Sequence, residues 1–300
     1  MKPAQLQLAV LLLGFSLAPC ASALTRVLIF TGLPGEASYE IAFAEQSRGL
    51  AEALRGTGAE VELYLTDQAD KTTLRGALAA ATSLRPSDQL MVIYIGHGSY
   101  DGRQFKLNLP GPDVSGAELD TWLDGIAATQ LVILASAASG AALDVLAAQR
   151  RTLMTATRSG DQSNATVFGH YLAMALEDPA GDLNKDRELS LSEVYELVAR
   201  SVADHYENRR LMATEHPQLV NVLPGFTLSH LGAMPVDPAT EALRNRRADA
   251  EAAIEALKER KSDLSPDSYF QQLQQLLLEL AVIEREIEQI TAAQAPAGEL

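Results

Sequence analysis

The stretch of sequence that decides the fold is QLMVIYIGHGSY, residues 89–100. Residues 89–95 are almost wholly apolar, as expected of a parallel strand that is covered on both faces of a sheet. The chain then continues as Gly96-His97-Gly98-Ser99, and the flanking glycines allow a sharp backbone turn beside the histidine ring. A side chain at the carboxyl end of a central parallel strand faces the crevice where open α/β sheets place their ligands. His97 is therefore the first candidate functional residue.

Strand and helix patterns alternate on both sides of this stretch. Short apolar and β-branched runs predict strands, and runs with an apolar period of 3.6 residues predict helices. In the first helix we expect Ile41, Leu50 and Leu54 to share the buried face. Such alternation is typical of an α/β fold, a mostly parallel sheet flanked by helices. The predicted strands are 26–31, 60–65, 89–95, 131–135 and 152–157, and the predicted helices are 39–56, 72–83, 115–126, 166–178 and 190–207.

Composition and charge argue against a nucleic-acid-binding protein and against a disordered one. The chain has 300 residues, with 24 Lys and Arg against 39 Asp and Glu, and a formal net charge of −15. This acidic balance argues against a nucleic-acid partner, because nucleic-acid binding needs a concentrated basic surface. Apolar residues make up 47% of the chain, which excludes disorder over most of its length.

Residues 1–23 have the pattern of a secretory signal peptide. Lys2 supplies the positive start, residues 8–17 form the apolar core, and Ala21-Ser22-Ala23 provides a small-residue cleavage site. No later stretch is long and apolar enough to predict a transmembrane anchor. We therefore expect an exported protein, periplasmic or extracellular. Cleavage after Ala23 removes Cys20, the single cysteine of the sequence, so the mature chain would contain no thiol.

A second group of small residues follows the next predicted strand. Residues 131–135 continue into Ser136-Ala137-Ala138-Ser139-Gly140. Consecutive strands of a parallel sheet are usually neighbours, and their carboxyl ends lie at the same edge. Two such strands that end in His and in Ser-Gly are a more specific signal of a site than Gly-His-Gly alone.

In these motifs the sequence resembles the caspase/legumain superfamily, and more specifically the legumain-type peptidases, over roughly residues 25–220. The resemblance implies a caspase-like three-layer sandwich. Those enzymes carry their catalytic histidine in a Gly-His-Gly type turn after one strand, and their cysteine follows the next strand in the order Cys, any residue, Ser, Gly. Carried over to this chain, His97 matches the general base, Gly98 and Ser99 match the turn after it, and Ser139-Gly140 matches the dipeptide after the nucleophile.

The departure from the family pattern falls on the nucleophile. Ala137 occupies the position of the cysteine, and a methyl group cannot attack a carbonyl, so the thiolate–histidine mechanism is absent. The resemblance thus implies an inactive cysteine peptidase that keeps the substrate crevice. The residues that it places in this substrate or partner crevice are Gly98, Ser99, Gly140, Thr157 and Arg158.

Three functions remain open at this point. The first is a non-catalytic pseudopeptidase whose crevice binds a peptide or a protein partner. The second is a serine-dependent hydrolase in which Ser136 or Ser139 is the nucleophile and His97 the base, with Asp101 or Asp113 orienting the histidine. Side chains alternate along a strand end, so Ser136 should point away from the side of the lost nucleophile. The third is a structural, envelope-associated protein that acts through its C-terminal helices.

The segment 182–193 has the spacing of an EF-hand-type calcium loop. Oxygen-bearing side chains stand at loop positions one, three, five, nine and twelve, with a backbone carbonyl at position seven. Position six, usually glycine, is Arg187, which a left-handed conformation strains by roughly 1 kcal/mol. The alternative is an ordinary helix start, because Ser190 and Glu193 also fit a capping box. The candidate ligands of a structural Ca²⁺ ion are Asp182, Asn184, Asp186, Glu188, Ser190 and Glu193.

Domain boundaries are predicted from changes in composition. The α/β domain spans 24–222, and the segment 223–239 contains prolines and glycines among few charges, as expected of a linker. Residues 240–292 are rich in Ala, Glu, Gln, Leu and Arg, and 293–300 form a tail.

Residues 240–292 are predicted to form a helical hairpin or coiled coil. Apolar residues recur at alternating steps of three and four, as in a coiled-coil seam, and Ser262-Asp263-Leu264-Ser265-Pro266-Asp267 interrupts the pattern. The hairpin is either a stabilising appendage or an arm for docking or oligomerisation. The predicted seam consists of Phe270, Leu273, Leu277, Leu280, Ile283, Ile287 and Ile290.

Overall fold

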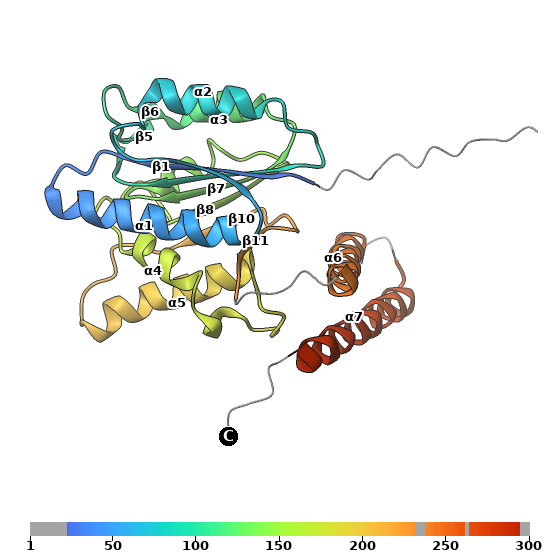
Figure 1. Cartoon of the computed structure of the whole chain (residues 1–300). Coiled ribbons are helices and arrows are strands. Elements are labelled where there is room, and N and C mark those ends of the chain that lie inside the picture. Colours follow the sequence, from blue (N-terminus) through green and yellow to red (C-terminus); the bar gives the residue numbers. More distant parts are fainter. Residues whose placement is uncertain (1–22, 232–237, 262–263, 295–300) are drawn as a thin grey trace, which may run out of the picture.

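The computed structural model describes residues 23–231, 238–261 and 264–294 (Figure 1). Apart from Ala23, the predicted signal peptide lies outside the described residues. None of the described helices is long and apolar enough to cross a membrane.

A six-stranded sheet forms the centre of the larger part of the molecule. Its strands are β1 (Thr25–Thr31), β2 (Glu60–Tyr64), β3 (Gln89–Ile95), β7 (Thr129–Ala135), β8 (Arg151–Thr155) and β10 (Gln218–Val220). The spatial order is β10-β8-β7-β3-β1-β2, and every pair is parallel except β10 with β8. The prediction of a mostly parallel sheet is confirmed, and β3 lies in its interior.

Helices cover both faces of this sheet (Figure 1). One face carries α1 (Ala37–Gly56), α4 (Phe168–Ala175) and α5 (Leu191–Asn208), and the other carries α2 (Lys71–Ala81) and α3 (Gly116–Asp124). Each layer packs against its own face of the sheet, which gives two clusters of buried side chains. We call them the α1-side core and the α2-side core. The three layers are those that the alternating pattern predicts.

The apolar character of β3 follows from its position between the two cores. Successive side chains of a strand point to opposite faces, so Ile93 and Ile95 belong to the α1-side core while Val92 and Tyr94 belong to the α2-side core. A strand that is buried on both faces needs apolar residues at every position. Trp122 of α3 also packs, partly buried, against the α2-side core.

The buried face of α1 differs from the predicted face. Leu50 and Leu54 are buried as expected, but Ile41 is 63% exposed. Phe43 and Ser47 are buried in its place, because they share the i, i+4, i+7, i+11 spacing with Leu50 and Leu54 and Ile41 does not. The Ser47 hydroxyl accepts a hydrogen bond from Thr31 at 2.8 Å, which explains a serine in this core.

Two small sheets were not predicted, because their strands are too short to show a two-residue period. One is an antiparallel sheet formed by β4 (Gly98–Tyr100), β5 (Phe105–Leu107) and β6 (Val114–Ser115). The other pairs β9 (Glu188–Ser190) with β11 (Thr227–His230). Since β11 lies inside the predicted linker 223–239, the domain boundary at 222 is wrong and the α/β domain continues at least to His230.

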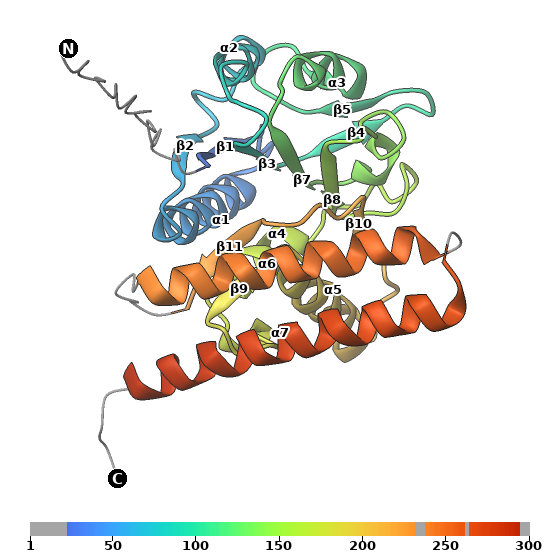
Figure 2. The ribbon, with the colours of Figure 1, turned by 90° about the vertical axis from the view of Figure 1, so that its right-hand side faces the viewer.

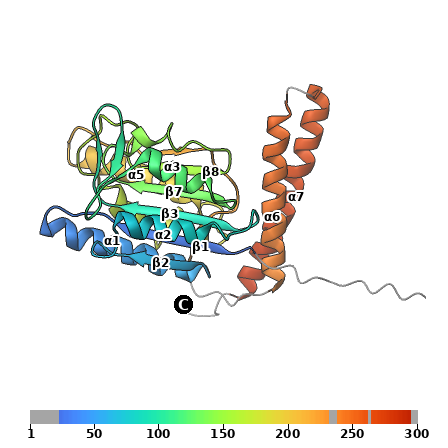
Figure 3. The ribbon, with the colours of Figure 1, turned by 90° about the horizontal axis from the view of Figure 1, so that it is seen from above.

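The predicted hairpin consists of α6 (Pro238–Glu259) and α7 (Pro266–Gln294), which lie side by side next to the α/β domain (Figures 2 and 3). Its own apolar cluster includes Leu243 and Ala250 of α6 with Ile283 and Ile287 of α7. These residues are not part of either sheet core.

The predicted seam of α7 is only partly correct. Ile283 and Ile287 pack toward α6, but Phe270 is 62% exposed and Leu277 is 48% exposed. Tyr269, two heptads before Ile283, is buried, so the buried face follows positions 269, 276 and 283. Phe270 and Leu277 each lie one residue, about 100°, further around the helix, and therefore belong to another face of α7. The side chain of Ile290 lies outside the described residues.

Candidate functional site

The ends of β3 and β7 bring the two predicted catalytic positions together. These strands pair in parallel with Ile95 opposite Ala135, so His97 and Ala137 each lie two residues beyond matched positions on neighbouring strands. A Cβ atom on Gly98 would come within 2.5 Å of the Ala137 carbonyl oxygen. The turn after His97 is therefore in contact with the turn that contains Ala137.

His97 is held by the loop before α1 and by the first turns of that helix. Its Nε2 atom lies 3.0 Å from the carbonyl oxygen of Pro34. The ring meets those of Tyr39 and Phe43 edge-on, with centroids 4.8 and 5.2 Å away. A carbonyl oxygen only accepts hydrogen bonds, so this contact places the proton of the neutral ring on Nε2 and leaves Nδ1 as an acceptor.

In the described part of the chain, neither aspartate that we expected to orient His97 bonds to it. Asp101 accepts backbone N–H bonds from residues 103 and 104 at 3.0 and 2.8 Å. Asp113 accepts bonds from the Asn108 side chain and from the backbone N–H of residue 109, both at 3.3 Å. Both carboxylates complete local turns of the small β4–β6 sheet, and the Pro34 carbonyl takes the orienting role.

The two candidate serines are both fully buried. The Ser139 hydroxyl lies 3.2 Å from that of Thr157 and accepts the Thr157 backbone N–H at 3.2 Å. Among the described residues, the Ser136 hydroxyl has no hydrogen-bond partner. A Cβ on Gly98 would meet that hydroxyl at 2.7 Å, so Ser136 packs against the turn after His97. Because no described contact joins either hydroxyl to His97, the geometry gives the serine-hydrolase hypothesis no support.

The turn after β7 is strained and tightly packed. Ala138 has a left-handed φ of 55°, which costs about 1 kcal/mol or more for a residue with a Cβ, and its N–H donates to the Gln162 carbonyl at 2.8 Å. Gly140 donates its N–H to the Thr157 hydroxyl at 2.9 Å and presses on the backbone of Arg158. The structure thus brings Gly140, Thr157 and Arg158 together at the end of β7, beside the His97 turn.

Glu215 has a structural role that was not predicted from the sequence. Glu215 is 2% exposed. Its carboxylate accepts the backbone N–H bonds of residues 167 and 168 at 2.7 and 3.2 Å, at the start of α4, and the Tyr206 hydroxyl at 3.0 Å. Burial raises the pKa of Glu215, and the N–H bonds partly offset the rise. No periodic pattern surrounds this residue, so nothing in the sequence signals the contact.

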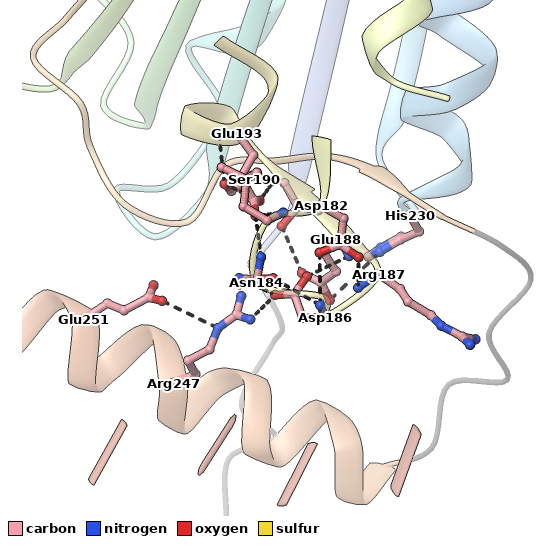
Figure 4. Close-up of polar contacts among 12 residues, drawn as sticks. Asp182, Asn184, Asp186, Arg187, Glu188, Ser190, Glu193, His230, Arg247 and Glu251 are labelled. Carbon is pink, nitrogen blue, oxygen red and sulfur yellow. Dashed lines mark hydrogen bonds and ion pairs between the residues drawn. The ribbon is translucent and has the colours of Figure 1, made fainter. Parts of the chain in front are cut away.

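The acidic loop 182–193 closes around its own backbone (Figure 4). Asp182 accepts the N–H bonds of Asp186 and Arg187 at 3.0 and 2.9 Å. Arg187 has the left-handed φ, 64°, that loop position six requires. Glu193 forms the predicted capping box with Ser190. Burial raises the pKa of Asp182, and the nearby Glu193 carboxylate raises it further.

α6 supplies a cation to this loop, as Figure 4 shows. The Arg247 guanidinium pairs with the Asp186 carboxylate, and its Nε lies 3.6 Å from Glu251. The Asn184 amide also donates to Asp186 at 3.1 Å, and Glu188 begins β9. Within the described residues, no group of three or more His, Cys, Asp or Glu side chains is arranged to hold a metal ion. The calcium site stays a prediction.

Comparisons with known proteins found similarity among solved structures only. No protein-family model matches the chain, and no curated protein matches it. Similar solved structures include protein GSU0716 from Geobacter sulfurreducens, at 16% identity and a TM-score of 0.44 over 73% of this chain and 96% of that chain. They also include caspase-1 from Spodoptera frugiperda (12% identity, TM-score 0.45, 71% and 92% covered) and the Drosophila initiator caspase Dronc (10%, 0.44, 66% and 79%). These values decide neither family nor chemistry.

Proposed function

We propose that the α/β domain is a pseudopeptidase that binds a peptide or a segment of a partner protein beside His97 without cleaving it. The observation that carries the proposal is the placement of His97 and Ala137 at matched ends of neighbouring strands. A histidine beside an alanine can form hydrogen bonds with a bound peptide, but covalent catalysis also needs a nucleophile.

The residues around His97 suit an extended peptide. The Nδ1 atom of His97 can accept an N–H bond from a peptide backbone. The partly exposed Tyr39 ring offers apolar surface next to it, and the buried Phe43 ring supports the imidazole from the core. Arg158 is exposed at the neighbouring turn, where its guanidinium can donate to a carboxylate of the ligand.

A random heptapeptide library displayed on phage, selected on the immobilised full chain, tests this proposal. We expect enriched peptides whose affinity, measured by fluorescence anisotropy, falls at least tenfold in His97→Ala. His170→Ala is the matched control, because His170 is exposed on α4 and should leave binding unchanged. Equal binding by wild type and His97→Ala, or no enrichment at all, would contradict the proposal.

The serine-hydrolase alternative has a direct test. We expect a fluorophosphonate probe to leave Ser136 and Ser139 unlabelled, because both hydroxyls are fully buried. Labelling of either serine that disappears in His97→Ala would replace the binding function with a hydrolase.

We also propose that the protein is exported, which the pattern of residues 1–23 supports. The expected mature chain begins at Leu24. Cell fractionation followed by N-terminal sequencing checks both the compartment and the cleavage site.

A structural calcium ion in the loop 182–193 is a further part of the proposal, supported by ligand spacing. Binding to the folded form alone stabilises it by about 2.7 kcal/mol when calcium is a hundredfold above its Kd. We expect several millimolar calcium to raise the melting temperature relative to excess chelator, and Glu193→Gln to reduce the rise. The rise should be larger in Arg247→Ala, because the guanidinium competes for Asp186. If wild type and Arg247→Ala each melt at the same temperature in calcium as in chelator, the loop is only a capped helix start.

A further inference from the structure

α7 carries a second apolar face that α6 does not cover. Leu278 is 61% exposed, whereas Ile283 on the α6 side of the same helix is fully buried. Contiguous exposed apolar side chains of this kind mark interaction surfaces. They line a shallow groove of about 410 Å³, formed by Phe270, Leu273, Gln274, Leu277 and Leu278.

The groove lies in an uncharged part of an acidic protein. From Ser268 to Leu278 the sequence reads SYFQQLQQLLL, without Asp, Glu, Lys or Arg. Two copies of a chain with a formal net charge of −15 repel each other over most of their surfaces. An apolar face without charge is where such copies can approach closely.

The charges that flank this face favour one relative orientation of two copies. Before it, residues 258–267 carry three positive and three negative side chains. Beyond it, residues 279–288 carry four Glu and one Arg. A parallel pair of α7 helices would place the two acidic segments side by side, whereas an antiparallel pair places each acidic segment against the balanced turn of the other copy.

We propose that this face of α7 is the contact between two copies of the chain, packed antiparallel about a two-fold axis near Gln274. Phe270 and Leu278 lie four residues on either side of Gln274, so each Phe270 meets Leu278 of the partner subunit, as an isologous contact requires. Phe270, Leu273 and Leu277 have the three–four spacing of a helix-packing seam.

The ends of the helices agree with this register. With a rise of about 1.5 Å per residue, Glu284 lies about 15 Å from Gln274 in one direction and Pro266 about 12 Å in the other. The turn that carries Arg260 and Lys261 therefore comes opposite the acidic segment of the second copy. Opposite charges at the rim of an interface fix orientation more than they add affinity.

Sedimentation analysis of the full chain tests the contact. We expect wild type to have the mass of a dimer at micromolar concentration and Leu277→Glu to have half that mass with unchanged circular dichroism. Ile41→Glu is the control, because Ile41 is an exposed apolar residue on α1, away from this face, and this variant should remain a dimer. A monomeric wild type, or a Leu277→Glu variant that stays dimeric, would overturn the proposal.

Cysteine cross-linking tests the orientation in a chain with Cys20→Ser, which removes the single native cysteine. With a short bis-maleimide, Gln274→Cys should link to itself across the two-fold axis, whereas Ser268→Cys should not. Linkage at both positions would indicate a parallel pair, and linkage at neither would exclude the contact. A monomer that floats with phosphatidylcholine vesicles, and no longer floats as Leu277→Glu, would assign the face to lipid and overturn the proposal.

Discussion

At Gly140, the turn after β7 passes so close to the neighbouring loop that a Cβ would lie 2.2 Å from both the Arg158 carbonyl carbon and the Ser159 nitrogen. Both are backbone atoms and cannot rotate away. Overpacking of this kind costs about 1–3 kcal/mol, and we expect urea denaturation of Gly140→Ala to show that loss. Gly49→Ala, where nothing lies within 4 Å of the new Cβ in the middle of α1, should instead gain about 0.5–1 kcal/mol. Unchanged stability of Gly140→Ala would contradict the close approach.

Glu215 should make stability depend on pH. Burial raises its pKa in the native state, so the native state keeps this proton at a pH where the unfolded chain has lost it. The stability that it contributes is complete below the unfolded pKa and is lost as pH rises through the folded pKa. Each unit of pKa difference amounts to about 1.4 kcal/mol.

The variant Glu215→Gln removes this titration. We expect the unfolding free energy of wild type, relative to that of the variant, to fall between pH 4 and pH 7 in urea titrations. A difference that does not change with pH would show that the pKa of Glu215 is not raised.

Individual residues show how far a sequence can define a site. The proximity of His97 to Ala137 was predictable, because both follow long apolar strands that become parallel neighbours. The contact of His97 with the Pro34 carbonyl was not, because it joins two irregular segments 63 residues apart. The burial of Ser139 likewise depends on Thr157, which no local pattern relates to it.

Among the elements, α6 is joined to the loop 182–193 by the ion pair of Arg247 with Asp186. The adjacent residue, Arg246, forms a second ion pair that serves as a control. Arg247 and Asp186 are 12% and 5% exposed, so Arg247→Ala leaves a buried carboxylate without its cation. Removing one partner of a buried pair costs about 3 kcal/mol, which urea denaturation should measure. Arg246→Ala, which removes a half-exposed pair with Glu286 at 3.7 Å, should cost less than about 1 kcal/mol. A similar loss of unfolding free energy in the two variants would show that the Arg247 ion pair stabilises the fold no more than an exposed pair does.

Long elements were predictable and short ones were not. The strand β3 and the helix α5 show clear apolar patterns over 7 and 18 residues. The strands β9 and β11 have 3 and 4 residues, and their pairing depends on segments almost forty residues apart. The three–four repeat of α7 correctly predicted a helix, but it could not show which of two faces meets α6.

For the whole molecule, the hairpin should be separable from the α/β domain. A chain that ends at Leu231 keeps β11 and both sheet cores, because the apolar cluster of the hairpin is distinct from them. We expect one cooperative thermal transition with a lower midpoint than that of the full chain, since Asp186 loses Arg247. Aggregation, or the absence of a transition, would show that the helices complete the domain.

The order of layers in the α/β domain followed from the alternation of strands and helices, whereas the position of the hairpin did not. Nothing in the spacing of residues 240–292 relates them to the loop at 182–193. The contact between α6 and this loop depends on one arginine among several in α6. Arg247 makes it and Arg246 does not, because the two residues lie on different faces of the helix.

The separation of the apolar cluster of the hairpin from the two sheet cores has an optical consequence. Trp122 is the only tryptophan of the chain and packs against the α2-side core, while residues 238–294 contain none. Fluorescence emission excited near 295 nm therefore reports on the α/β domain alone, while ellipticity at 222 nm records the helices of both parts. Recording the two signals together during one melt of the intact protein reveals the order in which the parts lose structure, without changing a residue.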